Sequence, residues 1–160
     1  MISSTKNNIV MALSIFLLIA CGFQLRGGIE ANFDSISING GSASFVKQLK
    51  KRLKQSSIEV VNSEGEIVLE IISDALDKRI LSLNSSGRVS EYELNYKIAY
   101  RVKGSSDDEW SQLITNEVRR QYTYDDENIV AKTLEEEKLI NGMQDELIRT
   151  ITAQISLYKV

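Results

Sequence analysis

The chemically reactive side chains of this chain are few, and their scarcity limits the chemistry that it can perform. The 160 residues include no histidine and a single cysteine, Cys21. Without histidine the chain has no Ser–His–Asp or Cys–His nucleophile arrangement, and it lacks the commonest general base and metal ligand. A lone cysteine forms neither an internal disulfide nor a CxxC site. These side chains point towards binding or assembly and away from catalysis.

The carboxylates are the remaining candidates for catalysis or for metal binding. Glu91 and Glu93 are spaced to share one face of a strand, but no nucleophile accompanies them, and such charges are usually solvated. The run Asp125–Glu127 lacks the spacing of a calcium loop, and capping of a helix explains it better. No GxSxG nucleophile elbow occurs. We therefore expect neither an enzyme nor a metal site.

Cys21 stands at the end of an N-terminal segment that has the composition of a secretory signal. Lys6 is the only charge before it, and the apolar run over residues 9–19 is too short to span a bilayer comfortably. Leu18-Ile19-Ala20-Cys21 resembles the lipobox of bacterial lipoproteins. We expect residues 1–20 to be a signal peptide, and Cys21 to carry a diacylglycerol and an N-acyl chain (palmitate) as a membrane anchor. A free-standing helix, or an ordinary signal with an incidental cysteine, is the alternative.

The residue after the cysteine and the charge of the mature chain bear on location and partners. Gly22 stands where an aspartate would resemble an inner-membrane retention signal, so we expect the outer membrane. Without residues 1–20 the chain has 140 residues and a net charge of −4. This mild acidity disfavours a nucleic-acid partner. We expect no cofactor other than the acyl groups on Cys21.

Basic and tyrosine side chains are the candidate ligand-binding features. Five cations within residues 47–54 fit a phosphate or membrane-surface contact, or else a solvated helix face with cations near its C-terminus. Tyrosines on the expected strands suit sugar or acyl contacts, although packing is their commoner role; they are Tyr92, Tyr96, Tyr100, Tyr122 and Tyr124. Cations near strand ends suit lipid phosphates, although each alone is most simply a surface charge; they are Lys78, Arg79, Arg88, Arg119, Arg120 and Lys132.

Hydrophobic periodicity predicts the strands that would position these side chains. The clearest strand covers residues 91–102, where six apolar or aromatic residues alternate strictly with the others. Further strands are predicted over residues 33–38, over 67–83 with a bulge in its polar middle, and over 110–124. In the second of these, Leu81 and Leu83 are expected to return to the face of Ile67. Residues 58–61 are predicted as a short extended segment.

Two helices complete the predicted fold. Ser42 or Ser44 is expected to cap the first, which has an apolar stripe of Phe45, Val46, Leu49 and Leu53. Asp125 and Asp126 are expected to cap the second, which runs almost to the C-terminus. The order of elements predicts an α+β fold, with two helices packed on one face of a four-stranded, largely antiparallel sheet. We expect a single domain over residues 34–160, joined to the lipidated cysteine by a tether, residues 21–33.

Three segments, in order and at matching spacing, carry a resemblance to a known family. They are Cys21-Gly22-Phe23-Gln24-Leu25-Arg26-Gly27, Gly87-Arg88-Val89-Ser90-Glu91-Tyr92, and Arg120-Gln121-Tyr122-Thr123-Tyr124 followed by Ala131-Lys132 and the last helix with Met143. Over most of the mature chain the sequence resembles the LPS-assembly lipoprotein family LptE. The resemblance implies the same layer of two helices on a four-stranded sheet.

The resemblance also implies a location, partners and a ligand. Members of the family face the periplasm at the outer membrane, inside the lumen of the LptD β-barrel. They plug and help assemble this translocon, and they bind LPS for delivery to the outer leaflet. Family lipid contacts lie at one end of the sheet and at the start of the last helix, where Lys132 falls. Ser85 stands near a position where a basic residue is expected, and Arg88 is its nearby substitute. The resemblance thus implies LPS contacts from Lys132, Arg88, Arg120 and Lys78.

A different function remains open on the residues themselves. Another periplasm-facing outer-membrane lipoprotein, acting as a pilotin or a barrel-assembly accessory, would share the lipobox. It would not share the Gly-Phe-x-Leu-Arg segment that follows Cys21. Partners recovered from the membrane distinguish the two.

Overall fold

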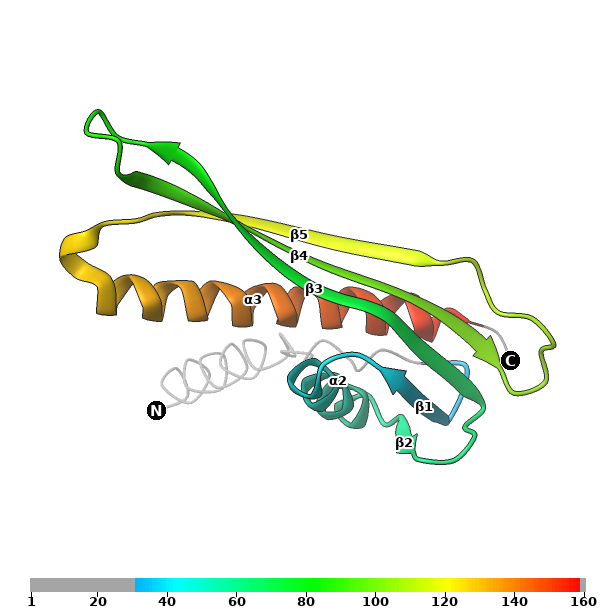
Figure 1. Ribbon diagram of the computed structural model, residues 1–160. Helices are drawn as coiled ribbons and strands as arrows, with labels where there is room; N and C mark the ends of the chain where they lie inside the picture. Colours follow the sequence, from blue (N-terminus) through cyan, green and yellow to red (C-terminus); the bar gives the residue numbers. More distant parts are fainter. Residues whose placement is uncertain (1–30, 159–160) are drawn as a thin grey trace, which may run out of the picture.

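The computed structural model describes residues 31–158 as two helices and a short 3₁₀ turn packed with a sheet (Figure 1). Cys21, the expected signal peptide and most of the expected tether lie outside these residues. In chain order the elements are β1 (Ser35–Gly40), α2 (Ala43–Gln55), β2 (Glu59–Val61), β3 (Ile67–Leu83), β4 (Val89–Gly104), β5 (Ile114–Thr123), η1 (Asp126–Asn128) and α3 (Ile129–Ser156). No helix within residues 31–158 is both long enough and apolar enough to cross a membrane.

The sheet has five strands in the order β2-β1-β3-β4-β5, so the prediction of four strands is wrong by one. The additional strand is β2, which the sequence presented only as a short extended segment because three residues show no periodicity. β1 is parallel to both β2 and β3, whereas β3, β4 and β5 are antiparallel. The sheet is therefore mixed, with α2 as the crossover that parallel neighbours require.

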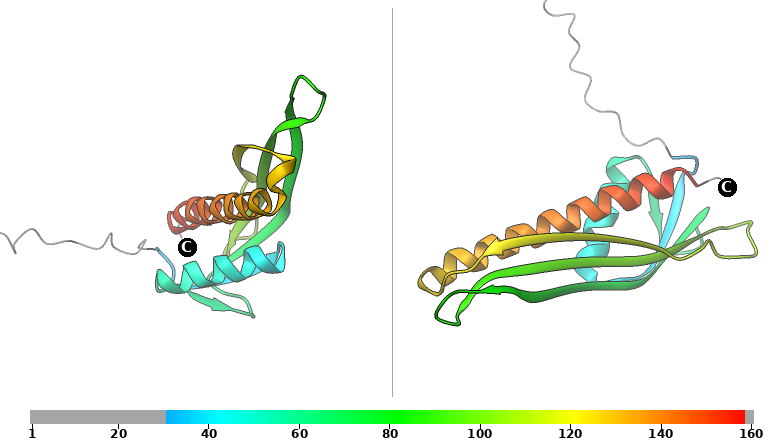
Figure 2. Two further views of the ribbon diagram at one scale, coloured as in Figure 1. Left: turned by 90° about the vertical axis from the view of Figure 1, so that its left-hand side faces the viewer. Right: turned by 90° about the horizontal axis from the view of Figure 1, so that it is seen from above.

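Both helices pack on one face of the sheet, as the α+β prediction requires (Figures 1 and 2). α3 runs along β4 and β5, while α2 lies across the end of the sheet that holds β1 and β2. The apolar stripe of α2 is confirmed, since Phe45, Leu49 and Leu53 are buried. Ser42 caps α2, because its Oγ accepts a hydrogen bond from the backbone N–H of Phe45. A shared hydrophobic core extends from Phe33 to Ile155.

The alternation over residues 91–102 is confirmed in β4, the central long strand. Its core-facing residues from Leu94 to Val102 are almost fully buried. Tyr96 and Tyr100 are therefore core residues, and burial raises the pKa of each phenol to about 12. These two tyrosines therefore pack in the core and are not available as ligand contacts.

β3 contains the predicted bulge, and the bulge reverses the side chains that face the helices. Ile71 pairs with Tyr100 and Ser73 pairs with Ala99, so Ile72 has no partner opposite it. Beyond this point the even-numbered residues of β3, including Lys78, share the core-facing side of β4. Two further register shifts follow Ile80, and the first of them reverses the parity again, so that Leu83 returns to the side of Ile67, although Leu81 and Leu83 both remain exposed.

α3 begins later than its predicted cap. Asp125 caps η1, since its Oδ1 accepts a 3.0 Å hydrogen bond from the backbone N–H of Glu127. α3 itself starts at Ile129, and Asp126 lies within the 3₁₀ turn rather than at the cap. The apolar stripe through Met143, Leu147 and Ile151 is buried as predicted. The 3₁₀ turn places the first residues of α3 below the hairpin that joins β3 and β4 (Figure 1).

Candidate functional site

A lysine, a glutamate and two tyrosines meet where β3, β4, β5 and α3 converge. Lys78 lies on the core-facing side of β3, opposite Leu94, because of the bulge at Ile72. Its Nζ donates a 2.6 Å hydrogen bond to Oε2 of Glu136, in the second turn of α3. The same carboxylate accepts a 2.6 Å hydrogen bond from the hydroxyl of Tyr122. We call this end of the domain, with the turn at residues 84–87 and the first two turns of α3, the hairpin end.

Aromatic rings surround the lysine of this cluster. Nζ of Lys78 lies 4.2 Å from the ring centroid of Tyr92 and 5.7 Å from that of Tyr122. Tyr92 stacks on Tyr122 with centroids 5.8 Å apart, and it meets Tyr124 edge-on at 5.1 Å. A cation over aromatic faces is stabilised by the ring quadrupole. Tyr92 and Tyr124 are half-buried at the rim of the core at the hairpin end, whereas Tyr122 is buried.

The electrostatics of the cluster keep Lys78 and Glu136 ionised. Partial burial alone would lower the pKa of Lys78, but its interactions with Glu136 and Tyr122 outweigh burial and raise it. Partial burial alone would raise the pKa of Glu136, but hydrogen bonds from Lys78 and Tyr122 lower it. At neutral pH the pair is therefore a charged one, with Lys78 held close to the protein surface.

Arg88 lies next to the turn at the tip of the hairpin. The side chain of Asn84 organises this turn, because its Oδ1 accepts hydrogen bonds from the backbone N–H groups of Ser86 and Arg88, both at 3.0 Å. Gly87 adopts a φ of 78°, the left-handed conformation that favours glycine. Arg88 is exposed and forms no ion pair within residues 31–158.

The other two expected lipid contacts differ in position. Lys132, in the first turn of α3, lies one helical turn before Glu136 and forms a 2.9 Å ion pair with Glu135. Arg120 pairs with Glu146, which lies ten residues, or about 15 Å, further along α3 than Glu136. The structure thus brings Lys78, Lys132 and Arg88 to the hairpin end. Arg120 lies level with Lys78 across the sheet, because Leu94 of β4 pairs with both, but its guanidinium contacts Glu146 rather than Glu136. Their contact with a lipid stays a prediction.

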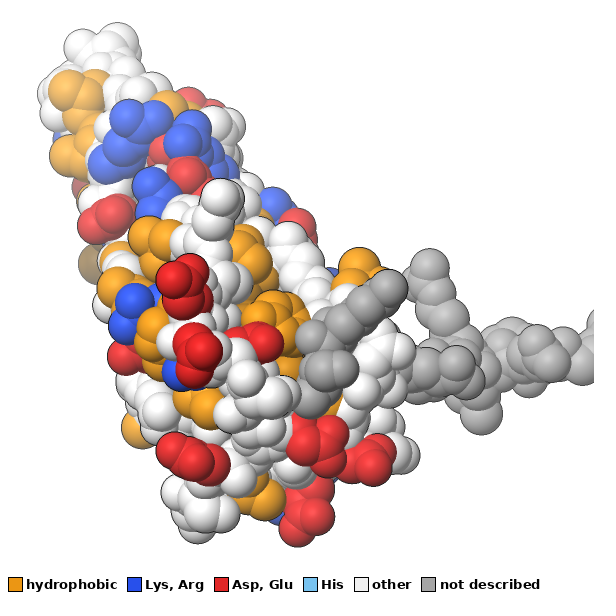
Figure 3. Space-filling view, turned by 90° about the vertical axis from the view of Figure 1, so that its right-hand side faces the viewer, with side chains coloured by type: hydrophobic (Ala, Val, Ile, Leu, Met, Phe, Trp, Pro, Cys, Tyr) orange, Lys and Arg blue, Asp and Glu red, His pale blue; other side chains and the backbone are white. Residues whose placement is uncertain are grey.

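Exposed apolar side chains gather at the same end. Of the ten large hydrophobic residues that are exposed within residues 31–158, seven belong to the outer half of β3 or to the start of α3: Leu76, Ile80, Leu81, Leu83, Ile129, Val130 and Leu134. Seen from the opposite end of the domain, basic side chains gather beside hydrophobic ones in the upper part of the view, and acidic ones lie mainly below (Figure 3). The sequence did not signal this grouping, because it depends on the register of β3.

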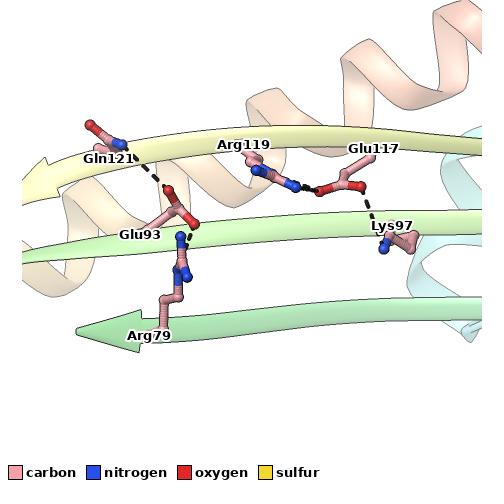
Figure 4. Close-up of polar contacts among 6 residues, drawn as sticks. All are labelled: Arg79, Glu93, Lys97, Glu117, Arg119 and Gln121. Carbon is pink, nitrogen blue, oxygen red and sulfur yellow. Dashed lines mark hydrogen bonds and ion pairs between the residues drawn. The ribbon is translucent and has the colours of Figure 1, made fainter. Parts of the chain in front are cut away.

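The sheet face that turns away from the helices carries a polar network (Figure 4). Glu93 accepts a 2.7 Å hydrogen bond from Arg79 and one of 3.4 Å from Gln121. These contacts leave its side chain only 7% exposed and lower the pKa of its carboxyl, mainly through Arg79. Nearby, Glu117 pairs with Arg119 and Lys97.

This network changes the sequence interpretation of one carboxylate. Glu93 was expected to be solvated, but neighbouring strands cover it with long polar side chains. A small cleft of about 240 Å³ adjoins it, lined by Asp77, Arg79, Glu93, Asn95 and Arg119. Neither a nucleophile nor a group of potential metal ligands accompanies these residues in the described part of the chain. The arrangement makes a flat, charge-balanced polar surface.

Comparisons with known proteins agree with this architecture. No curated protein matches the chain in sequence. The solution structure of an uncharacterized lipoprotein B from Nitrosomonas europaea is 31% identical, with a TM-score of 0.72 over 84% of this chain and 90% of that one. The rare lipoprotein B from Shewanella oneidensis is 27% identical, with a TM-score of 0.67 over 76% and 93%. A minor lipoprotein from Acinetobacter baumannii, at 20% identity, shares the fold, with a TM-score of 0.65 over 79% and 92%.

A family model extends the agreement across the described domain. The model of LptE, described as lipopolysaccharide-assembly, matches residues 33–155. This range begins at the first buried residue, Phe33, and ends at the last buried isoleucine of α3, Ile155. The match therefore covers the whole hydrophobic core, and the chain belongs to the LptE family of lipopolysaccharide-assembly lipoproteins.

Proposed function

We propose that this protein is anchored to the outer membrane by acyl groups on Cys21, plugs the lumen of the LptD β-barrel, and helps to assemble it. In this proposal the domain faces the periplasm and binds LPS for delivery to the outer leaflet. It carries out no covalent chemistry and needs no cofactor. Membership of the LptE family supports the role in LPS assembly, and the residues of the hairpin end support the ligand.

The observation that carries the proposal is the grouping of cations with exposed apolar side chains at the hairpin end. LPS presents phosphate groups next to acyl chains, so a complementary surface needs cations beside apolar area. Arg88 is exposed and without an ion pair among the described residues, so it is available for a phosphate. Lys132 and Lys78 are held nearby by carboxylates that a phosphate could replace. The exposed leucines and isoleucines of β3 and α3 supply the apolar part.

The outer face of the sheet supports the second part of the proposal. A domain inside a water-filled barrel needs a face that is polar and does not aggregate. The charges of Arg79, Glu93, Lys97, Glu117 and Arg119 are paired across strands or, for Glu117 and Arg119, within β5, which makes this face polar with little net charge (Figure 4). Such a face suits a polar lumen wall without a need for complementary charge.

Affinity purification of the tagged protein from detergent-solubilised outer membranes, followed by mass spectrometry, tests the partner. We expect a stoichiometric large β-barrel, LptD, to co-purify. If the protein is recovered alone, or with secretin or peptidoglycan partners, the plug is refuted. Recovery with a secretin would instead support the pilotin alternative.

The double variant Arg88→Ala/Lys132→Ala tests the lipid contact. We expect LPS binding to weaken at least about tenfold, since each charge-assisted contact contributes on the order of 1 kcal/mol, while the barrel complex persists. Lys97→Ala/Arg119→Ala, on the opposite face of the sheet, is the matched control because it removes the same charge. Equal losses in both double variants, or unchanged binding in the first, would remove the hairpin end as the LPS site.

A further inference from the structure

The first helix of the domain concentrates positive charge in a chain that is acidic overall. α2 contains five cations and no acidic residue, whereas the whole chain has a net charge of −3. The cations are Lys47, Lys50, Lys51, Arg52 and Lys54, and we call them the basic face of α2. Seven ion pairs join charged residues within residues 31–158, and none of them involves this helix. Most cations on the strands have a carboxylate partner, whereas α2 groups five cations without one.

The helix presents these cations to solvent beside a small apolar area. Phe45, Leu49 and Leu53 turn into the core, which leaves Lys47, Lys51 and Lys54 exposed on the remaining surface. A shallow hollow along this surface is lined by Ala43, Val46, Lys47, Lys50, Lys51 and Lys54. Apolar side chains therefore form part of its floor, with the aliphatic stems and ammonium groups of the lysines around them.

A second cleft continues the positive charge between the two helices. It has a volume of about 390 Å³, and its charged lining residues are Lys51, Arg52, Arg149 and one carboxylate, Asp145. Nε of Arg52 is buried there and has no hydrogen-bond partner within residues 31–158. Three cations thus face one carboxylate, and the cleft is positively charged overall.

The position of α2 places its basic face at the point where the described chain begins. The backbone N–H of Ile58, just after α2, bonds to Leu53, and that of Glu59 bonds to Asp34. The C-terminal end of α2 therefore lies beside Asp34, near the N-terminal limit of the described residues (Figure 2). The hairpin end lies away from this region along the sheet (Figure 1).

We infer that the basic face of α2 binds the phosphate headgroups of anionic phospholipids at a membrane surface. Four of the five cations are lysines, whose flexible point charges suit a fluid layer of headgroups, whereas arginine favours bidentate pairing with fixed carboxylates on a protein. The apolar floor with lysine stems suits the headgroup boundary. This surface is separate from the expected LPS contacts, and the inference does not depend on the acyl anchor.

Co-sedimentation with vesicles tests the inference. The full chain carrying Cys21→Ala is used, so that no acyl chain contributes, with vesicles of phosphatidylcholine alone or mixed in equal parts with phosphatidylglycerol. We expect binding to the mixed vesicles that high salt abolishes. Lys47→Gln/Lys51→Gln/Lys54→Gln should weaken it at least about tenfold, because each cation near an anionic surface contributes about fivefold. Circular dichroism checks that the variant keeps its fold.

The control triple variant removes the same charge elsewhere on the domain. Lys97→Gln/Lys103→Gln/Lys138→Gln, which lie outside α2 and outside the expected LPS contacts, should leave vesicle binding within about twofold of the parent, since distant charges are screened. Equal losses in both triple variants would show non-specific attraction and overturn the inference. So would a larger loss in the control, which would assign the lipid to a surface other than α2. Absence of any preference of the parent for phosphatidylglycerol would also overturn it, and would favour an acidic protein surface as the occupant.

Discussion

Breaking the ion pair between Lys78 and Glu136 should lower the stability of the fold and strengthen the binding of an anionic lipid. Glu136→Gln keeps the size of the side chain and an oxygen that accepts from Tyr122, but it removes the charge that holds Lys78. Because Lys78 and Glu136 are 36% and 24% exposed, the contact lies between a surface pair and a buried one. We expect the free energy of unfolding to fall by about 1 kcal/mol, or on the order of 4 °C in Tm.

The same substitution should strengthen the binding of an anionic lipid. It leaves Lys78 without its carboxylate partner and removes a negative charge from the hairpin end. We expect LPS binding to tighten about fivefold, the contribution of about 1 kcal/mol from one unit of charge near an anionic lipid. Glu137→Gln is the control, because Glu137 is exposed on the next residue of α3 and forms no ion pair within residues 31–158. It changes the net charge equally without releasing Lys78.

The pH dependence of the stability difference gives an independent check. The pKa of Glu136 is lower in the folded protein than its ordinary value of 4.5. A carboxyl with a lowered pKa stabilises the fold above its unfolded pKa, and this contribution disappears as the pH falls through the folded value. Thermal unfolding followed by circular dichroism should therefore separate wild type from Glu136→Gln at neutral pH and bring them together at about pH 3. An equal gain in LPS binding for the two glutamine variants, or a loss for Glu136→Gln, would refute the reasoning.

Three further predictions concern the core, the turns and the anchor. Leu147→Ala should lower the free energy of unfolding by about 3 kcal/mol in a denaturant titration, because Leu147 is 1% exposed. Gly40→Ala should prevent stable folding, since φ is 77° at this position and the new Cβ would lie 2.2 Å from the carbonyl oxygen of Ile71. Gly87→Ala, at a φ of 78° but in open space, should lower the free energy of unfolding by only about 1 kcal/mol. Comparable melting temperatures for the two variants would contradict this prediction. Cys21→Ala should remove the protein from outer-membrane fractions, and its persistence there on immunoblots would count against the lipid anchor.

The sequence predicts those parts of the fold that repeat a local period. Leu94, Ile98 and Val102 in β4 and Leu147 and Ile151 in α3 are buried where their spacing places them. β2 was missed because three residues carry too little period. The sequence also does not predict the register of β3 after Ile72. A polar middle indicates a bulge, but pairing with β4 determines which residue is left without a partner.

The candidate site was predicted less completely than the fold, for the same physical reason. Lys78 was singled out as a cation near a strand end, but its contact with Glu136 joins residues 58 positions apart. Such a contact depends on how α3 lies against β3 and β5, which no local pattern encodes. Glu93 shows the converse error: alternation placed it on the polar face correctly, but only the neighbouring strands reveal that Arg79 and Gln121 cover it.

Pairing of the cations separates those that hold the fold from those that are available to a ligand. Arg79 and Arg119 each have a carboxylate partner on the sheet, so binding an outside anion would first require breaking a contact within the domain. Arg88 and the basic face of α2 have no such partner among residues 31–158 and lose no ion pair there when an anion binds. Lys78 is intermediate, because a phosphate must displace Glu136. The unpaired Arg88 and the unpaired cations of α2 lie on different parts of one small acidic domain, and two separate anionic surfaces therefore explain them better than a single ligand.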